Sequence, residues 1–493
     1  MEGRAPKIHS IRHNFIMNAI QVASTFLFPL ITFPYVSRVL GAAGTGRVAF
    51  AVSVVYYFTA VASLGIPTYG LRACARCRED PEQLRQTVQE LLLLGCVLTA
   101  LCYAALLILI HIVPRFEQDR TLLLVCSGTL LLTNIGAEWF YQAIEQYDYI
   151  TLRNIAFKLL SLVLMFLLVK TPDDCAVYAG VQVLATVGAN VLNFLRLNRF
   201  VSLRPVGHWD IRRHLRPTLV FFLLAVATTI YTNLDTVMLG FMTDDTMLGY
   251  YNAAVKIKGI LVSVVTALGV VLLPRLSFYL ESGRETEFRR IARSAMQVVL
   301  VMAVPLTLYC MLEAENIIRL LSGREYLPAV PAMIAIMPTL LLIGLSNVTG
   351  IQILVPLGKE RLTVRSTVWG AATDLVLNLI LIPRLGALGA AIGTLAAETV
   401  VLAVQLYYLR EERTLRPDAA DTLKILLSAA VGAAVILLGR AVLGPVQSSF
   451  LALLLSAVGF FGACAAVLLV TKEHAIREFV LPTLKRFLPK ASS

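Results

Sequence analysis

Eight ionisable side chains lie within long apolar stretches of this 493-residue sequence: Arg38, Glu138, Lys158, Asp235, Lys256, Lys258, Asp374 and Glu398. A charge at the centre of a lipid bilayer costs about 3 kcal/mol or more, so such residues usually face a cavity or a partner and mark functional sites. If the apolar stretches cross a membrane, these eight residues are candidates for transport chemistry.

Two pairs of these residues match in depth on consecutive predicted spans. Asp235 and Lys256 lie roughly 10 Å from the outer surface at about 1.5 Å per residue. They can form an ion pair that locks a hairpin, or Lys256 can line a cavity. Lys258 is two positions further on, about 200° around the helix, so the two lysines cannot share a face. Glu138 and Lys158 match in depth nearer the cytoplasmic side, where we expect a structural ion pair.

Asp374 and Glu398 lie deeper, on the eleventh and twelfth predicted spans. No basic residue in that hairpin matches their depth. Because desolvation favours the neutral form of a buried carboxyl group, these two residues are candidates for ion or proton coupling. Hydrogen bonding to neighbouring helices is the alternative.

The elements that position these residues follow from composition. The chain is 58% hydrophobic and 15% charged, whereas a soluble domain carries roughly a quarter charged residues. Apolar runs of about twenty residues are typical of transmembrane helices, which satisfy their own backbone hydrogen bonds. We predict an all-α polytopic membrane protein with fourteen spans: 14–37, 47–66, 88–113, 121–143, 150–169, 175–198, 218–242, 249–273, 291–312, 328–356, 363–382, 386–409, 422–443 and 449–471.

The net charge of +12 is concentrated in the loops. With the N-terminus inside, Lys and Arg favour the inner segments over the outer loops by roughly three to one, as the positive-inside rule requires. We therefore predict that both termini are cytoplasmic and that the partners are membrane lipids rather than nucleic acid. The tail from Lys472 is predicted to lie on the inner membrane surface.

The two halves of the sequence resemble each other at an offset of about 200–212 residues. Residues 39–51 match 238–254, including Gly46 with Gly249, and residues 149–153 match 361–365. Parallel repeats around a central site are a common transporter plan. The predicted domains are a six-helix lobe at 1–205, a second six-helix lobe at 206–415, and an appended helix pair with a basic cytoplasmic tail at 416–493.

Signatures of enzymes and metal sites are absent from the sequence. Cys74 and Cys77 form a lone CxxC pair, which cannot complete a tetrahedral zinc site. There is no Walker A loop, no HExxH pattern and no sizeable soluble domain. We predict no catalytic residues, no metal and no cofactor.

Several motifs resemble those of one membrane protein family. The stretch Ala137–Ile150, the stretch Leu234–Gly240 with Gly249–Lys256, the segment Arg38–Gly41 and the segment Gly386–Ala391 are similar to Wzx-type polysaccharide flippases of the multidrug/oligosaccharidyl-lipid/polysaccharide exporter superfamily. The resemblance covers residues 10–480. It implies two six-helix lobes in a V with two extra C-terminal helices, in a bacterial cytoplasmic membrane.

The resemblance also implies a function. A flippase of this family moves an oligosaccharide linked to undecaprenyl pyrophosphate from the inner to the outer leaflet for cell-surface polysaccharide synthesis. The pyrophosphate requires cations, and Arg38, Lys256, Arg47 and Lys258 are the candidates. Asp235, Glu138 and Lys158 are then candidates for gating or ion pairs. Other membrane proteins of polysaccharide assembly are candidate partners.

Two alternatives have different requirements. A multidrug extruder of the same fold exports organic cations and needs an acidic cavity, for which Asp374 and Glu398 are candidates. A membrane glycan polymerase or ligase needs catalytic residues in large outer loops, and the outer loops here are short.

Overall fold

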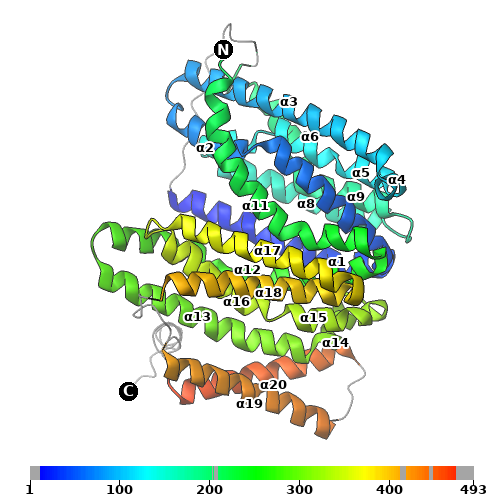
Figure 1. The fold of residues 1–493 in the computed structure, drawn as a ribbon, viewed down its shortest axis with the longest axis vertical. Coiled ribbons are helices and arrows are strands. Elements are labelled where there is room, and N and C mark those ends of the chain that lie inside the picture. The colour runs from blue at the N-terminus through cyan, green and yellow to red at the C-terminus, as the bar shows by residue number, and fades with distance from the viewer. Residues whose placement is uncertain (1–10, 203, 205–208, 411–417, 444–447, 474–493) are drawn as a thin grey trace, which may run out of the picture. The chain divides into compact units, whose positions relative to one another are not determined.

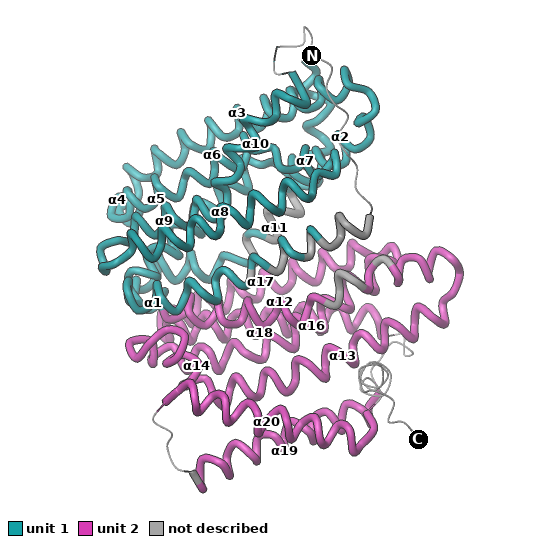
Figure 2. Tube along the Cα trace, turned by 180° about the vertical axis from the view of Figure 1, so that it is seen from behind, with its two compact units in different colours: residues 1–249 teal, residues 250–493 magenta. Residues whose placement is uncertain are grey.

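Every regular element in the described residues is a helix, and the chain is an all-α polytopic membrane protein. The computed structural model describes residues 11–202, 204, 209–410, 418–443 and 448–473, with only the backbone at some positions of α1, α11 and α12. The chain divides into two compact units, residues 1–249 and 250–493 (Figure 2). Each unit is described by itself.

The first unit contains eleven α-helices and one π-helical segment in its described part (Figure 1). They are α1 (Ile11–Ser63), α2 (Ile66–Arg76), α3 (Pro81–Ile112), α4 (Pro114–Gln118), α5 (Arg120–Cys126), α6 (Gly128–Ile135), α7 (Glu138–Ala143), α8 (Tyr147–Leu168), α9 (Cys175–Val183), η1 (Leu184–Gly188), α10 (Asn190–Leu197) and α11 (Arg212–Met242). α11 packs along α1 and contacts α2 within this unit.

The second unit contains most of α12 (Asp245–Glu281), which begins in the first unit. It continues with α13 (Glu285–Leu312), α14 (Ala314–Leu321), η2 (Arg324–Ala329), α15 (Val330–Ile336), α16 (Thr339–Asn347), η3 (Val348–Leu354), α17 (Glu360–Leu385), α18 (Ala387–Tyr408), α19 (Ala419–Leu443) and α20 (Ser449–Val470). α17 lies beside α18, and α19 beside α20 (Figure 1). A core of Val265, Leu276, Phe288 and Met296 joins α12 to α13.

Several predicted spans are bent or broken. α1 is two helices merged across Gly41, which has φ 67° and ψ −178°, a left-handed φ that suits glycine. This break separates the predicted stretches 14–37 and 47–66. The segment 175–197 bends by 41° at Ala189, and the segment 324–354 bends by 42° between α15 and α16. The π-helical segment η1 directly precedes the first bend, whereas the π-helical segment η3 follows α16, away from the second bend. Such segments often mark functional positions in helices.

The predicted number of spans is partly matched. Nine helices in the described residues are long and apolar enough to cross a membrane, or up to eleven if each bent pair is one span. The total of fourteen stays a prediction. Most of the predicted basic tail lies in 474–493, outside the described residues.

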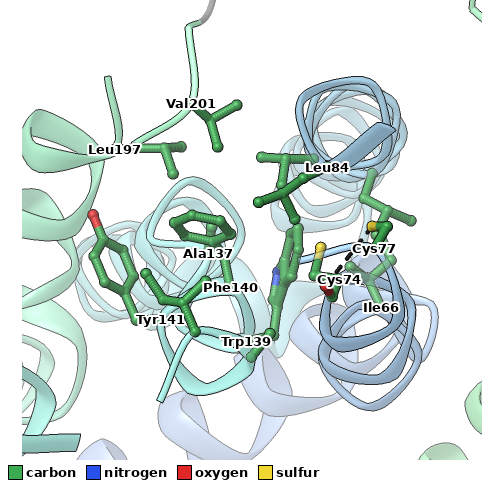
Figure 3. Close-up of a cluster of buried hydrophobic side chains, with 14 of the residues drawn as sticks. Ile66, Cys74, Cys77, Leu84, Ala137, Trp139, Phe140, Tyr141, Leu197 and Val201 are labelled. Atoms are coloured by element: carbon green, nitrogen blue, oxygen red, sulfur yellow. Dashed lines mark hydrogen bonds between the residues drawn. The ribbon is translucent and has the colours of Figure 1, made fainter. Parts of the chain in front are cut away.

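A buried aromatic cluster joins α2, α3, α7 and the segment after α10 in the first unit (Figure 3). Trp139 and Phe140 come from the motif Ala137–Ile150, and Trp139 lies next to Cys74 in the close-up. A Cβ atom on Gly70 would lie 2.7 Å from the Trp139 ring, so α2 packs directly on this ring. The motif thus fixes the position of α2.

Two glycines matched between the sequence repeats approach the same helix crossing within the first unit. A Cβ atom on Gly46 of α1 would lie 1.9 Å from the carbonyl oxygen of Asp245. A Cβ atom on Gly249 of α12 would lie 1.9 Å from the carbonyl oxygen of Ala42. The two backbones therefore touch, as small residues at membrane helix interfaces allow.

The substitution Gly249→Ala is expected to destabilise the protein, because overpacking of this kind typically costs about 1–3 kcal/mol. The melting temperature of the detergent-solubilised protein would measure this effect. Gly259→Ala on the same helix is the matched control, since nothing lies within 4 Å of a Cβ atom there. Equal melting temperatures for the two variants would contradict the described crossing.

Candidate functional site

A pocket of about 450 Å³ opens in the first unit where α2 ends, α3 begins and α11 begins. This volume lies within the roughly 300–1,000 Å³ usual for ligand pockets. Its lining consists of Tyr69, Arg72, Ala73, Arg76, Cys77, Gln83, Thr87, Arg213, His214, Pro217 and Phe221. We call it the arginine pocket.

One face of α2 forms a wall of the arginine pocket. Tyr69, Arg72, Ala73 and Arg76 lie at positions i, i+3, i+4 and i+7, which share one side of a helix. α2 begins directly after Gly65, which has φ 70°. A Cβ atom on Gly65 would lie 2.6 Å from the backbone nitrogen of Phe222, so the start of α2 is in close contact with α11.

Glu90 on α3 holds the first turn of α11 against the pocket. Its side chain is fully buried and accepts hydrogen bonds from Arg213 Nε at 2.9 Å and from the backbone N–H of Asp210 at 2.8 Å. Its Oε2 also lies 2.7 Å from His214 Nε2. The other ring nitrogen of His214 lies 2.8 Å from the Tyr69 hydroxyl, which connects α3 to α2 through α11.

The charge of the arginine pocket is positive. Glu90 balances Arg213, with which it forms an ion pair of 2.6 Å. Arg72 stacks over the Phe221 ring at 5.1 Å, an arrangement that holds a guanidinium group by cation–π attraction. Within the described part of the chain, neither Arg72 nor Arg76 forms an ion pair. Two guanidinium groups are therefore left to attract an anion.

Cys77 lies between α2 and α3 and lines the same pocket. A hydrogen bond with Cys74 lowers the pKa of Cys77 to about 7, and Thr87 lowers the pKa further against the opposing effect of burial. The thiolate is thus substantially populated at neutral pH. Among the described residues, no group of three His, Cys, Asp or Glu side chains could hold a metal ion.

The predicted cation Arg38 lies just before the Gly41 break of α1. Its side chain is exposed and donates a hydrogen bond of 2.6 Å to the Pro34 carbonyl oxygen. The predicted cation Arg47, on the other side of the break, forms an ion pair with Asp119 at 2.9 Å. Asp119 also contacts Arg115, which pairs with Asp245. Arg47 is therefore part of a network that ties α1, α4 and the start of α12.

The predicted ion pair between Glu138 and Lys158 is wrong. Glu138 pairs with Arg153 at 2.8 Å, and Lys158 donates a hydrogen bond of 2.8 Å to the Ser24 hydroxyl. Arg153 also donates to the carbonyl oxygen of Ala189, at the bend after η1. Equal depth in the membrane does not guarantee contact, because the side chains can point in different directions around their helices.

Asp235 is buried on α11 in the first unit, whereas Lys256 and Lys258 are half-buried on α12 in the second unit. Each of the three has an interaction within the chain. Whether Asp235 pairs with Lys256 stays a prediction.

Asp374 and Glu398 are both buried, on α17 and α18 of the second unit. Asp374 and Asn378 lie on the side of α17 that faces Gly393 of α18. A Cβ atom on Gly393 would lie 2.2 Å from Asn378 Oδ1 and 3.3 Å from Asp374 Oδ1. The two carboxyl groups thus belong to one closely packed helix pair, and their role in ion coupling stays a prediction.

Sequence reasoning missed the arginine pocket and its anchor. Glu90 lies near the start of the predicted stretch 88–113, and it could have been counted among the intramembrane charges. Arg72 and Arg76 are four residues apart after an aromatic residue, a spacing that puts both on one helix face. Their proximity to Arg213, however, depends on the packing of α2 against α11.

The helical fold, with nine to eleven candidate membrane spans in the described residues, defines a multi-pass membrane protein. The chain belongs to the polysaccharide biosynthesis protein family, whose model matches residues 11–280. The MatE family model matches residues 222–380. With the motifs above, these matches identify a Wzx-type flippase of the exporter superfamily.

Two relatives illustrate the range of similarity. The putative O-antigen transporter of Escherichia coli (strain K12) is 24% identical over 408 residues, covering 82% of this chain and 98% of that protein. The probable flippase AglR of Haloferax volcanii is 29% identical over 178 residues, covering 36% of this chain and 37% of that protein.

Two solved structures share the fold. The lipid II flippase MurJ in an inward closed conformation has a TM-score of 0.74 at 14% identity, covering 94% of this chain and 100% of that one. An inward-facing multidrug resistance MATE family transporter of the MOP superfamily has a TM-score of 0.63 at 14% identity, covering 82% and 98%.

The substitution Glu90→Gln is expected to lower the free energy of unfolding by about 1.5–3 kcal/mol, because the amide loses the charge-assisted hydrogen bonds that the carboxylate makes with the exposed Arg213 and the buried His214. Chemical denaturation of the detergent-solubilised protein would measure the change. Glu79→Gln, at an exposed position nearby, is the control. Equal stability of both variants would show that Glu90 does not anchor α11.

Alkylation of Cys77 by N-ethylmaleimide is expected to reach half its maximal rate at about pH 7, because the pKa of Cys77 is lowered to that value from 9.0. Mass spectrometry of the labelled peptide would measure the rate. Cys74→Ala removes the largest lowering effect and is expected to shift the midpoint upward. A midpoint near pH 9 in the unmodified protein would contradict the described thiol pair.

Proposed function

We propose that this chain moves a lipid-linked oligosaccharide from the inner to the outer leaflet of the bacterial cytoplasmic membrane for cell-surface polysaccharide synthesis. The match to the Escherichia coli O-antigen transporter over 98% of its length carries this proposal. MurJ, the structural neighbour named as a lipid II flippase, has the same fold. The lipid carrier is undecaprenyl pyrophosphate, and the chain is a transporter without catalytic residues.

The proposed topology places both termini and the arginine pocket on the cytoplasmic side. Between the predicted spans, the segments 67–87 and 199–217 are rich in arginine and are expected on the inside by the positive-inside rule. Both segments supply residues to the pocket. The proposed lobes at 1–205 and 206–415 and the appended part at 416–493 differ from the compact units, since α11 packs with the first unit. The lobes follow the sequence repeats, whereas the units follow packing.

The proposed transport cycle is alternating access. A substrate can shift such a cycle only by binding one conformation more tightly than the other. The diphosphate supplies negative charge for this difference, and we propose Arg38, Arg47, Lys256 and Lys258 as cations that bind it along the path. Asp235, Glu138 and Lys158 are proposed to position these cations or to gate. Membrane proteins of polysaccharide assembly are proposed partners.

A MATE-like cation antiporter is the second candidate function. The MatE model match at 222–380 includes Asp374, and Glu398 lies nearby on α18, so this half carries buried acidic groups suited to ion coupling. The full-length similarity to a named O-antigen transporter favours the flippase. A membrane glycan polymerase or ligase has no support among the relatives named here.

Depletion of this protein is expected to trap the lipid-linked glycan precursor in the inner leaflet. Accessibility of the glycan at the outer surface of spheroplasts would measure this. Wild type is expected to restore export. Arg38→Ala and Lys256→Ala are expected to reduce export roughly tenfold or more, because a hydrogen bond to a charged group is worth about 1.5–3 kcal/mol.

Arg319→Ala, which removes a surface arginine paired with Glu315 on α14, is the control. Normal export by well-expressed Arg38→Ala and Lys256→Ala would remove these two residues from the path. Outer-leaflet precursor in depleted cells, together with sensitivity to cationic dyes, would support the antiporter instead.

A further inference from the structure

The arginine pocket is lined by arginines of α2 and α11, and Glu90 of α3 holds α11 in place. Arg213 and His214 are bonded to the buried Glu90, so their polar atoms serve mainly to fix α11. Arg72 and Arg76 are exposed at the pocket and form no ion pair within the described residues. Among the described residues, no carboxylate pairs with these two arginines, so the pocket can accept an anionic ligand.

The geometry of Arg72 and Arg76 suits an anion with several charges. The two residues are four positions apart on α2, about 6 Å along the helix axis, so both can reach one ligand. The Phe221 ring covers one face of the Arg72 guanidinium group and leaves its N–H edge available. Guanidinium groups bind phosphate oxygens through two parallel hydrogen bonds, which ammonium groups cannot do.

We propose that the arginine pocket binds the diphosphate group of the lipid-linked glycan before transport, with Arg72 and Arg76 as its ligands. This inference rests on the proposed function and assigns the first binding step to the first unit alone. Glu90 acts as a positioning residue, because it holds the pocket wall of α11 without facing the ligand. Tyr69 is fixed through His214 in the same way.

Other sources could supply the same phosphate chemistry. The two arginines could contact the headgroups of ordinary anionic phospholipids, as basic residues at the cytoplasmic surface often do. Free inorganic phosphates are the third source. The three ligands differ in structure, since only the proposed substrate joins a diphosphate to a prenyl chain. Their relative affinities for the pocket therefore distinguish the three sources.

The test measures binding to the purified full-length protein in nanodiscs. The probes are farnesyl diphosphate, inorganic pyrophosphate and phosphatidylglycerol titrated into neutral discs. Farnesyl diphosphate is expected to bind and to slow alkylation of Cys77 in the pocket wall. Arg72→Ala with Arg76→Ala is expected to weaken this binding roughly tenfold or more. Arg72→Lys with Arg76→Lys keeps the charge and is expected to recover part of it.

The charge-matched control is Arg78→Ala with Arg85→Ala. These arginines lie at the same end of the unit but outside the pocket lining, where Arg78 pairs with Glu145 and Arg85 donates to the Arg204 carbonyl oxygen. This variant is expected to bind farnesyl diphosphate as wild type does. Equal weakening by both double variants would reduce the effect to general surface charge and overturn the inference.

Three further results would overturn the proposed site. One is unchanged farnesyl diphosphate binding by the folded Arg72→Ala, Arg76→Ala variant. The others are equal binding of inorganic pyrophosphate alone, which would indicate a free anion site, and phosphatidylglycerol binding that displaces the probe, which would indicate a phospholipid contact.

The depletion assay separates this inference from the proposed function. If wild type restores glycan export and the Arg72→Ala, Arg76→Ala variant restores it equally at the same membrane level, only the pocket assignment fails. If wild type has no effect on export, the proposed function itself fails, whatever the pocket binds.

Discussion

The carboxylate of Glu90 is the interaction on which the described end of the first unit depends. It is fully buried and gathers Arg213, His214 and the backbone of Asp210 onto α3. A buried carboxylate is costly unless several donors satisfy it. Here the donors come from the start of α11 and the residues just before it. The hydrogen bonds that satisfy the charge therefore also place the helix. The wall of the arginine pocket follows from it.

The close helix crossing at Gly46 and Gly249 complements this polar anchor. The polar anchor holds α11 at one end, whereas the glycine crossing holds the start of α12 against α1 by backbone contact. The network of Arg47, Asp119, Arg115 and Asp245 ties the same segments near that crossing. Membrane helices gain little from apolar burial against each other, so small-residue contacts and polar bonds determine how they pack.

Much of the helical order could be predicted from the sequence. The stretches 121–143, 150–169 and 386–409 correspond to α5–α7, α8 and α18, because long apolar runs with charged ends leave the backbone few alternatives in a membrane. Side-chain partners could not be predicted in the same way. Glu138 contacts Arg153 rather than Lys158, since depth along a helix is countable but direction around it depends on tertiary packing. The arginine pocket forms where residues 69–77 pack against residues 213–221. No local sequence pattern predicts this long-range contact.

The hydrogen bonds around the linker between α10 and α11 have an evolutionary consequence. Arg85 and Gln89 of α3 bind the Arg204 carbonyl oxygen, and Glu90 binds the backbone of Asp210. Both ends of the loop are thus attached to the same helix. Because these hydrogen bonds themselves hold the start of α11 on α3, insertions and deletions between the two attachment points are expected to be tolerated. Homologous chains should differ in length at this point more readily than at the short turn between α17 and α18.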